Sequence, residues 1–310
     1  MLQYAIKRLI LGVITVWFIA TATFVAMHAV PGDPLSGAKA MTPEIRQNLE
    51  ARYGLDKPIG QQYLIYMNNL AQGDLGISFT QKNREVNDII RDHFPVSATL
   101  GIMAIVFAGL GGALFGALTA LSRNKWPDTV IMIAVILGIS VPSFVFAAFS
   151  QLLIVKLNAA VGFSLLPVAG WGGVGHILVP SLVLGLGTMA YLTRLMRSSM
   201  LEIISSDYVR TANAKGLPAT RIFIHHQMRN AILPLVTVLG PAIAAITTGG
   251  FVVELVFAIP GLGRYFVQAV QQLDYTVIMG TTVFFGAFLV LMVIIVDLLY
   301  GFIDPRVRVG

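Results

Sequence analysis

Cysteine is absent from the 310-residue chain, and charged residues are scarce, at 12% of the total. Without cysteine there can be no disulfide, no thiolate nucleophile and no cysteine-ligated metal site. Soluble domains carry about 25% charged residues, whereas here 56% of the residues are hydrophobic. This composition excludes an ordinary soluble domain and indicates an integral membrane protein.

Motifs of hydrolysis and of nucleotide binding are also missing. The sequence has no HExxH pair, no GxSxG elbow and no convergent pair of carboxylates, so we do not expect an enzyme. It has no glycine-rich phosphate loop followed by Lys and Ser or Thr, so any ATP that drives it would bind to a separate chain. The net charge of +6 is modest, and we expect it to reflect cytoplasmic loops rather than a nucleic-acid partner.

Long apolar runs dominate what is present, and they predict an all-α integral membrane protein with six transmembrane helices. The predicted spans cover approximately Leu9–Val30, Ala98–Leu121, Thr129–Val155, Ile177–Leu195, Ala231–Phe257 and Thr276–Tyr300. Lys7 and Arg8 precede the first span, which predicts a cytoplasmic N-terminus, and no small-residue cleavage site follows, so we expect a retained anchor. The basic tail around Arg306 predicts a cytoplasmic C-terminus.

One segment, 31–96, is soluble-like and is expected on the extracytoplasmic side. Its seven Lys and Arg are balanced by eight Asp and Glu, and long loops translocate largely regardless of charge. We expect it to be helical, with helices over Thr42–Tyr53, Gln61–Ala71 and Val86–Phe94 and a turn at Gly73–Gly76. The chain thus divides into 1–30 with the first span, 31–96 outside, and a core of five further spans over 97–310.

Glycine and proline predict how several spans pack and end. The second span has a face of small residues suited to close helix packing, made by Gly109, Gly111, Gly112 and Gly116. Pro142 predicts a kink in the third span. The fifth span is expected to end in an outside turn over Ile259–Arg264, followed by a short helix.

The stretch Ser205–Pro234 lies between two predicted spans, yet it is polar and basic. Ser206 or Asp207 can cap a short helix that runs to Lys215. Gly216 can adopt the left-handed conformation that ends this helix, and Pro218 prevents its continuation. A second helix is expected to start near Ala219. Such a short helix suits the groove of another protein, and an ordinary solvated loop is the alternative.

Ionisable residues inside membrane spans usually mark function, and here they are few. Glu254, Asp297, His28 and His176 all lie near span ends, where water reaches them, so a structural role is expected for each. An ion-coupled carrier would keep polar or ionisable groups near the midplane. The nearly bare midplane argues against that class.

Eight short motifs follow one another along the chain. They are Lys7–Leu9, Pro31–Pro34, Tyr53–Pro58, Gly73–Gly76, Ser140–Phe144, Asp207–Gly216, Glu254–Gly263 and Asp304–Arg306. Together they resemble the inner-membrane permease subunits of ABC importers, in the dipeptide/oligopeptide (peptide/nickel) permease family, over essentially the whole chain. The resemblance implies the type I importer permease fold and the transport of oligopeptides or dipeptides.

The resemblance also implies a coupling helix in the cytoplasmic loop 198–230, which would seat in a cleft of an ATPase subunit. The implied residues are Ser206, Asp207, Tyr208, Val209, Arg210, Thr211, Ala212, Asn213, Ala214, Lys215 and Gly216. Arg210-Thr211-Ala212 stands where the general permease pattern has Glu-Ala-Ala, and the spacer to Ile232–Pro234 is longer, as in the peptide branch. Arg210 is the first candidate for a polar contact, because its planar guanidinium suits carboxylates.

Partners follow from the same resemblance. They are a second homologous permease, two ATPase subunits that bind ATP and Mg, an extracytoplasmic binding protein, the peptide and membrane lipid, while this chain itself would hold no metal or cofactor. An outer gate is implied for Glu254, Pro260, Gly261 and Gly263, with a plain turn as the alternative. Segment Pro31–Pro95 would contact the binding protein or form a self-packed cap.

Three hypotheses for function remain open at this point. The first is the peptide permease in a plasma or inner membrane. The second is the same machine carrying nickel or another small solute; clustered His in the spans would favour it, whereas His225 and His226 lie on the cytoplasmic loop. The third is a channel or secondary carrier without an ATPase, which would show midplane charges or an inverted repeat.

Overall fold

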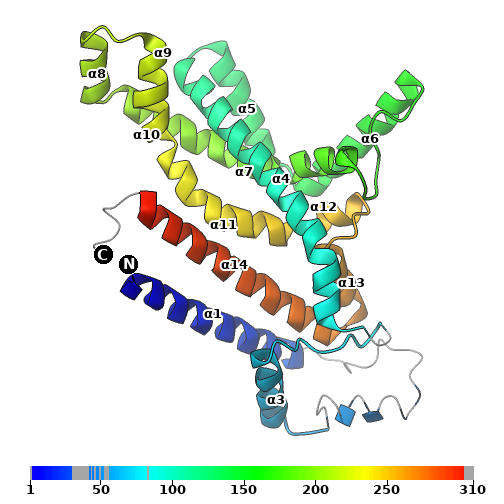
Figure 1. Cartoon of the computed structure of the whole chain (residues 1–310). Helices are drawn as coiled ribbons and strands as arrows, with labels where there is room; N and C mark the ends of the chain where they lie inside the picture. The colour runs from blue at the N-terminus through cyan, green and yellow to red at the C-terminus, as the bar shows by residue number, and fades with distance from the viewer. Residues whose placement is uncertain are drawn as a thin grey trace. The chain divides into compact units, whose positions relative to one another are not determined.

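The structure, a computed structural model, describes residues 2–29, 56–81 and 84–303, together with residues 42, 44, 47, 48, 50 and 51. Its helices in chain order (Figure 1) are α1 (Leu2–Ala29), α3 (Ile59–Ala71), α4 (Val86–Leu121), α5 (Trp126–Ser140), α6 (Ser143–Val161), α7 (Val174–Ile204), α8 (Asp207–Ala214), α9 (Ala219–Arg221), the π-helix η1 (Ile222–Met228), α10 (Arg229–Ala231), α11 (Leu233–Gly249), α12 (Phe251–Val256), α13 (Leu262–Gln272) and α14 (Tyr275–Ile303). Extended pairing in this described part is limited to one isolated bridge between Ile77 and Glu85.

Six segments of the described chain are long and apolar enough to cross a membrane, which confirms the predicted number. They are Ile6–Ala29, Val86–Leu121, Ser143–Val161, Val174–Ile204, Leu233–Val256 and Tyr275–Val296. The predicted helix at Gln61–Ala71 is confirmed as α3. The expected Pro31–Pro34 turn and the tail at Asp304–Arg308 lie outside the described residues, as does most of the expected helix at Thr42–Tyr53.

Two predicted boundaries are wrong in an informative way. The expected helix at Val86–Phe94 and the second span form one continuous helix, α4, with Pro95 inside it. The third span is broken rather than kinked, because α5 ends at Ser140 and α6 begins at Ser143. Val141 has extended backbone dihedrals, φ −91° and ψ 126°, as expected for a residue that the ring of a following proline excludes from the helical region.

Contacts divide the chain into two units. The first comprises Met1–Val96 and Pro260–Ile294, and the second comprises Ser97–Ile259 and Ile295–Gly310. In the first unit α1 lies close to α14, since a Cβ on Gly286 would approach within 2.7 Å of Ile19 Cδ1. On the other side of α1, Thr21 and His28 hydrogen-bond Tyr63 and Gln62 of α3. His28 therefore has a structural contact, as its position near a span end suggested.

Asp274 joins two distant parts of the first unit. Its side chain is fully buried, and its carboxylate accepts hydrogen bonds from Ser78 Oγ, Phe79 N, Thr80 N and Thr80 Oγ1. It also accepts one from Val277 N in the first turn of α14. The last of these donors lies at the N-terminus of α14, where a carboxylate is favoured. This arrangement fixes the segment before α4 against the start of α14.

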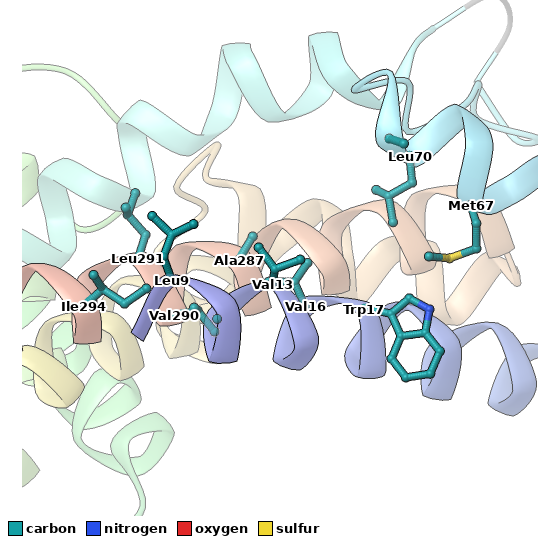
Figure 2. A pocket seen from close by; sticks show the side chains of 12 residues that line it. Leu9, Val13, Val16, Trp17, Met67, Leu70, Ala287, Val290, Leu291 and Ile294 are labelled. Carbon is teal, nitrogen blue, oxygen red and sulfur yellow. The ribbon is translucent and has the colours of Figure 1, made fainter. Parts of the chain in front are cut away.

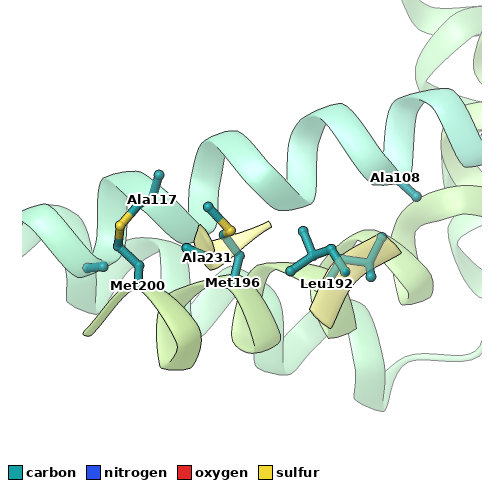
Figure 3. Close-up of a cluster of buried hydrophobic side chains, with 8 residues drawn as sticks. Ala108, Ala117, Leu192, Met196, Met200 and Ala231 are labelled. Atoms are coloured by element: carbon teal, nitrogen blue, oxygen red, sulfur yellow. The ribbon is translucent and has the colours of Figure 1, made fainter. Parts of the chain in front are cut away.

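The second unit packs around α4, α7 and α11. Its core cluster, shown in Figure 3, contains Ala108, Ala117, Ala120, Leu192, Met196, Met200, Ala231 and Leu235. Small residues on α4 permit this contact, since a Cβ on Gly112 would lie 2.5 Å from Leu192 Cβ. The predicted close-packing face is confirmed for Gly111, Gly112 and Gly116, whereas nothing lies within 4 Å of a Cβ on Gly109.

We expect Gly112→Val to lower the thermal stability of the detergent-solubilised protein and Gly109→Val to leave it nearly unchanged. The first substitution forces atoms into Leu192, whereas the second adds them to open space. Overpacking a helix contact costs about 1–3 kcal/mol. Thermal unfolding of the two variants side by side is the measurement, and equal melting temperatures would contradict the packing described for α4 and α7.

Candidate functional site

The loop between α7 and α11 begins at a sharp break. The α7 helix ends at Ile204, and Ser206 has the extended backbone of an N-cap, φ −72° and ψ 152°. Its carbonyl accepts the first bond of α8 from Arg210 N at 3.1 Å. The predicted side-chain cap is wrong, because Ser206 Oγ instead donates to Ile203 O at 2.6 Å, back toward α7. The hydroxyl therefore ties α8 to the end of α7.

The end of α8 follows the prediction closely. Gly216 has φ +70°, in the left-handed region, and its N–H donates to Asn213 O at 2.9 Å. Leu217 N donates to Ala212 O at 3.3 Å. These two bonds are those of a Schellman motif, which satisfies carbonyls that a helix end leaves free. Leu217 also packs against the apolar cluster that contains Ala212, and an apolar contact commonly accompanies this motif.

The α8 helix has one buried and one exposed face. Val209 and Ala212, three residues apart, are 1% and 4% exposed and pack against Ile222. The remaining positions from Asp207 to Gly216 are exposed. The Arg210 side chain is 72% exposed, and its guanidinium lies 3.7 Å from the carboxylate of Asp207, which is 98% exposed. Such a solvent-exposed pair holds the guanidinium weakly, so it is accessible to another molecule.

The second half of the loop is helical from Ala219, as predicted, but its centre is the π-helix η1. Figure 1 shows this half lying beside α8. Tyr208 Oη of α8 lies 2.9 Å from Asn230 Nδ2 and 3.4 Å from His226 O. Sequence reasoning missed both the π-helix and these contacts, since no local residue pattern signals either.

An ion pair joins the start of α5 to the C-terminal half of α7. Arg197 of α7 binds Asp128, at the start of α5, through two parallel bonds of 2.9 Å, Nε to Oδ1 and Nη2 to Oδ2. Asn124 N also donates to Asp128, at 3.1 Å. The hydrogen bond from Arg197 holds the pKa of the Asp128 carboxyl below its usual range. The loop Ser122–Asp128 and this part of α7 therefore lie together.

The proposed gate residues lie in both units, and each is described within its own. In the second unit Glu254 is 2% exposed and accepts a hydrogen bond from Ser97 Oγ at 2.6 Å. In the first unit Pro260 O accepts from His93 Nδ1 at 2.8 Å. Helix α13 begins at Leu262 with Gly261 as its N-cap. The predicted turn is therefore too long, because Gly263 already lies inside a helix.

An apolar pocket of about 470 Å³ lies in the first unit, between α1, α3 and α14. Figure 2 shows Val13, Val16 and Trp17 of α1, Leu70 of α3 and Val290 of α14 among its lining side chains. Its lining offers the indole N–H of Trp17 as a side-chain hydrogen-bond donor and no charged group. We therefore do not assign peptide recognition to it.

The six candidate spans and the loop between α7 and α11 together define the class of protein. It is a multi-pass helical membrane protein that exposes a short helix between its fourth and fifth spans. Two family models match the chain. Residues 1–101 match the N-terminal part of the binding-protein-dependent transport system membrane component, and residues 112–309 match the inner membrane component itself. The chain belongs to this family and is an inner-membrane permease of a binding-protein-dependent ABC transporter.

Several curated relatives match over the full length. The dipeptide transport system permease protein DppB of Bacillus subtilis is 44% identical over 99% of this chain and 98% of its own length. The oligopeptide transport system permease protein OppB of Haemophilus influenzae is 40% identical over 99% of this chain and all of its own. OppB of Escherichia coli is 38% identical with the same coverage. The resemblance seen in the motifs is thereby confirmed.

Proposed function

We propose that this chain forms, with a second homologous permease, the membrane path through which dipeptides or oligopeptides enter the cell. The proposal of a peptide substrate is supported by the relatives, which are named as permeases of dipeptide and oligopeptide transport systems. Nickel or another small solute remains the alternative for the same machine. A channel or secondary carrier without an ATPase is disfavoured, because the family is one of binding-protein-dependent transport systems.

The proposed mechanism rests on helix α8, whose position is fixed and whose outer face is exposed. Its N-terminal end is tied to α7 through Ser206, its C-terminal end is closed by the bonds of Gly216 and Leu217, one face is buried, and the other face is exposed. We assign the exposed face, from Ser206 to Gly216, to the cleft of an ATPase subunit. We expect Arg210 to bind a carboxylate of that subunit, because a guanidinium and a carboxylate can form two parallel hydrogen bonds.

The complete transporter would contain two ATPase subunits and an extracytoplasmic binding protein besides the two permeases. ATP with Mg, held by the ATPases, supplies the free energy, and both termini of this chain lie in the cytoplasm. Approach of the two ATPases moves α8 of each permease inward, and α7 and α11, which pack together in the core cluster, move with it. Glu254, Pro260, Gly261 and Gly263 are proposed for the outer gate, which opens to receive peptide and then closes.

Co-purification from the native membrane tests the assembly. We expect the tagged chain to retain a second six-span permease and ATPase subunits in detergent, and Arg210→Glu to reduce ATPase recovery about tenfold by placing like charges together. Arg123→Glu, the same charge reversal on the exposed loop between α4 and α5, is the matched control and should not change recovery. Purification of the chain without any ATPase would contradict the proposal.

Uptake assays address the substrate separately. In vesicles that contain the whole assembly and its binding protein, we expect ATP-dependent uptake of a labelled dipeptide or tripeptide that excess unlabelled peptide abolishes. Excess nickel should not compete with this uptake. Uptake of nickel without uptake of peptide would support the alternative substrate and leave the assignment of α8 intact.

A further inference from the structure

Helix α8 is held to the rest of its unit along two lines of contact. Along the first line, Val209 and Ala212 pack against Ile222, with Ile203 and Leu217 beside them. These contacts are apolar, and apolar attraction has no preferred direction. Between its two fixed ends, a helix of eight residues that is held along its length by this stripe alone resists rotation about its own axis only weakly.

The second line is set by Tyr208, one residue before Val209 and therefore about 100° around the helix. Asn230 Nδ2 donates to Tyr208 Oη at 2.9 Å and to His226 O at 3.2 Å, and Tyr208 Oη lies 3.4 Å from the same carbonyl. Hydrogen bonds weaken steeply when they are misaligned. This triangle therefore fixes the rotation of α8 against η1 and α10.

The far side of the triangle is anchored in the core cluster of the second unit. Asn230 precedes Ala231, which is fully buried in the core cluster with Met196, Met200 and Leu235. A single residue, Ile232, separates α10 from α11, the helix of the fifth span. His226 lies within η1, and π-helical segments are rare and occur frequently at functional sites.

We propose that Tyr208 and Asn230 are positioning residues that transmit the displacement of α8 to α11. The inference rests on the proposed function, in which an ATPase subunit moves α8. With the triangle intact, a push on α8 carries α10 and the start of α11 with it. Without the triangle, α8 can rotate slightly on its apolar stripe without moving α10, so ATP is hydrolysed while fewer peptides are transported for each ATP.

The test compares ATP hydrolysis with peptide uptake in vesicles that contain the complete assembly. Tyr208→Phe keeps the ring and removes the hydroxyl, and Asn230→Ala removes the other partner. We expect each substitution to lower the number of peptides transported per ATP about fivefold, the factor that matches one net hydrogen bond. The double variant should be no worse than either single variant, because the two groups act as one unit. Tyr191→Phe, on the half-exposed Tyr191 of α7, is the control and should keep the wild-type ratio.

The outcomes separate this inference from the proposed function. If ATPases accompany the wild-type chain and transport is coupled, but Tyr208→Phe keeps the wild-type ratio, the inference is wrong and the proposed function stands. If Tyr208→Phe lowers thermal stability or ATPase recovery as much as it lowers transport, the triangle only holds the fold together and the inference is also wrong. If the wild-type chain recovers no ATPase, the proposed function itself fails.

Discussion

Replacement of Gly216 by proline is expected to abolish peptide transport while the protein still inserts into the membrane. The proline ring fixes φ near −65°, whereas this position has φ +70°. Proline would also remove the N–H that donates to Asn213 O at 2.9 Å. Together these changes cost about 3 kcal/mol or more, so we expect about a 100-fold loss of ATP-dependent uptake and of ATPase recovery.

Two further glycine variants make this prediction specific. Gly216→Ala meets no atom within 4 Å, so it should show only the cost of the left-handed backbone, about 1–2 kcal/mol, and an intermediate loss. Gly162 ends α6 with φ +81° and a bond from its N–H to Asn158 O. Gly162→Pro thus makes the same local change outside the loop, and it should leave ATPase recovery at the wild-type level. Equal recovery with Gly216→Pro and with wild type would contradict the role of α8.

Substitution of Asp274 by asparagine is expected to give the largest loss of stability. Every donor around this fully buried carboxylate points at one of its two oxygens. An asparagine of the same shape would turn its NH2 group toward some of these donors, and those hydrogen bonds would be lost. Hydrogen bonds to a charged group are each worth about 1.5–3 kcal/mol, so we expect the melting temperature in detergent to fall by about 5–10 °C.

The control for this prediction is another aspartate of the same unit. Asp92 is 57% exposed and forms an ion pair with Arg84 at 3.2 Å. Because solvent-exposed pairs contribute little, Asp92→Asn should melt within about 1 °C of wild type. A wild-type melting temperature for Asp274→Asn, or an equal loss for Asp92→Asn, would show that the segment Ser78–Thr80 is not held through Asp274.

Local signals explain why much of this molecule could be predicted from sequence. The number of spans was predicted correctly because each span lies in a long apolar run, and such a run marks a candidate for a spanning helix. The end of α8 was found because glycine and proline constrain the backbone directly. At Pro142 the same signal was underestimated, since its ring ends one helix and begins another rather than bending one.

Features that depend on distant residues could not be predicted. Asp274 meets Ser78 across 196 positions of sequence, and no periodicity reports such a contact. Ser206 or Asp207 was expected to cap α8, and Ser206 is the N-cap residue. Its hydroxyl, however, donates to the carbonyl of Ile203 rather than accepting a bond from α8, since a serine near a helix end can bond in either direction. Tyr208 belonged to the predicted coupling segment, yet its contact with Asn230 appears only when the π-helix η1 brings the two together.

Site-directed cross-linking tests the assignment of α8 most directly. Because the chain has no cysteine of its own, a thiol reagent labels only the cysteine that is introduced into it. A cysteine at exposed Thr211 in α8, labelled with a photoactivated maleimide, is compared with one at Val174, which is 74% exposed. Val174 begins α7 and lies about 45 Å from the end that leads to α8. We expect a cross-link to an ATPase subunit from Thr211→Cys and none from Val174→Cys. An ATPase cross-link from Val174→Cys but not from Thr211→Cys would contradict the assignment of α8.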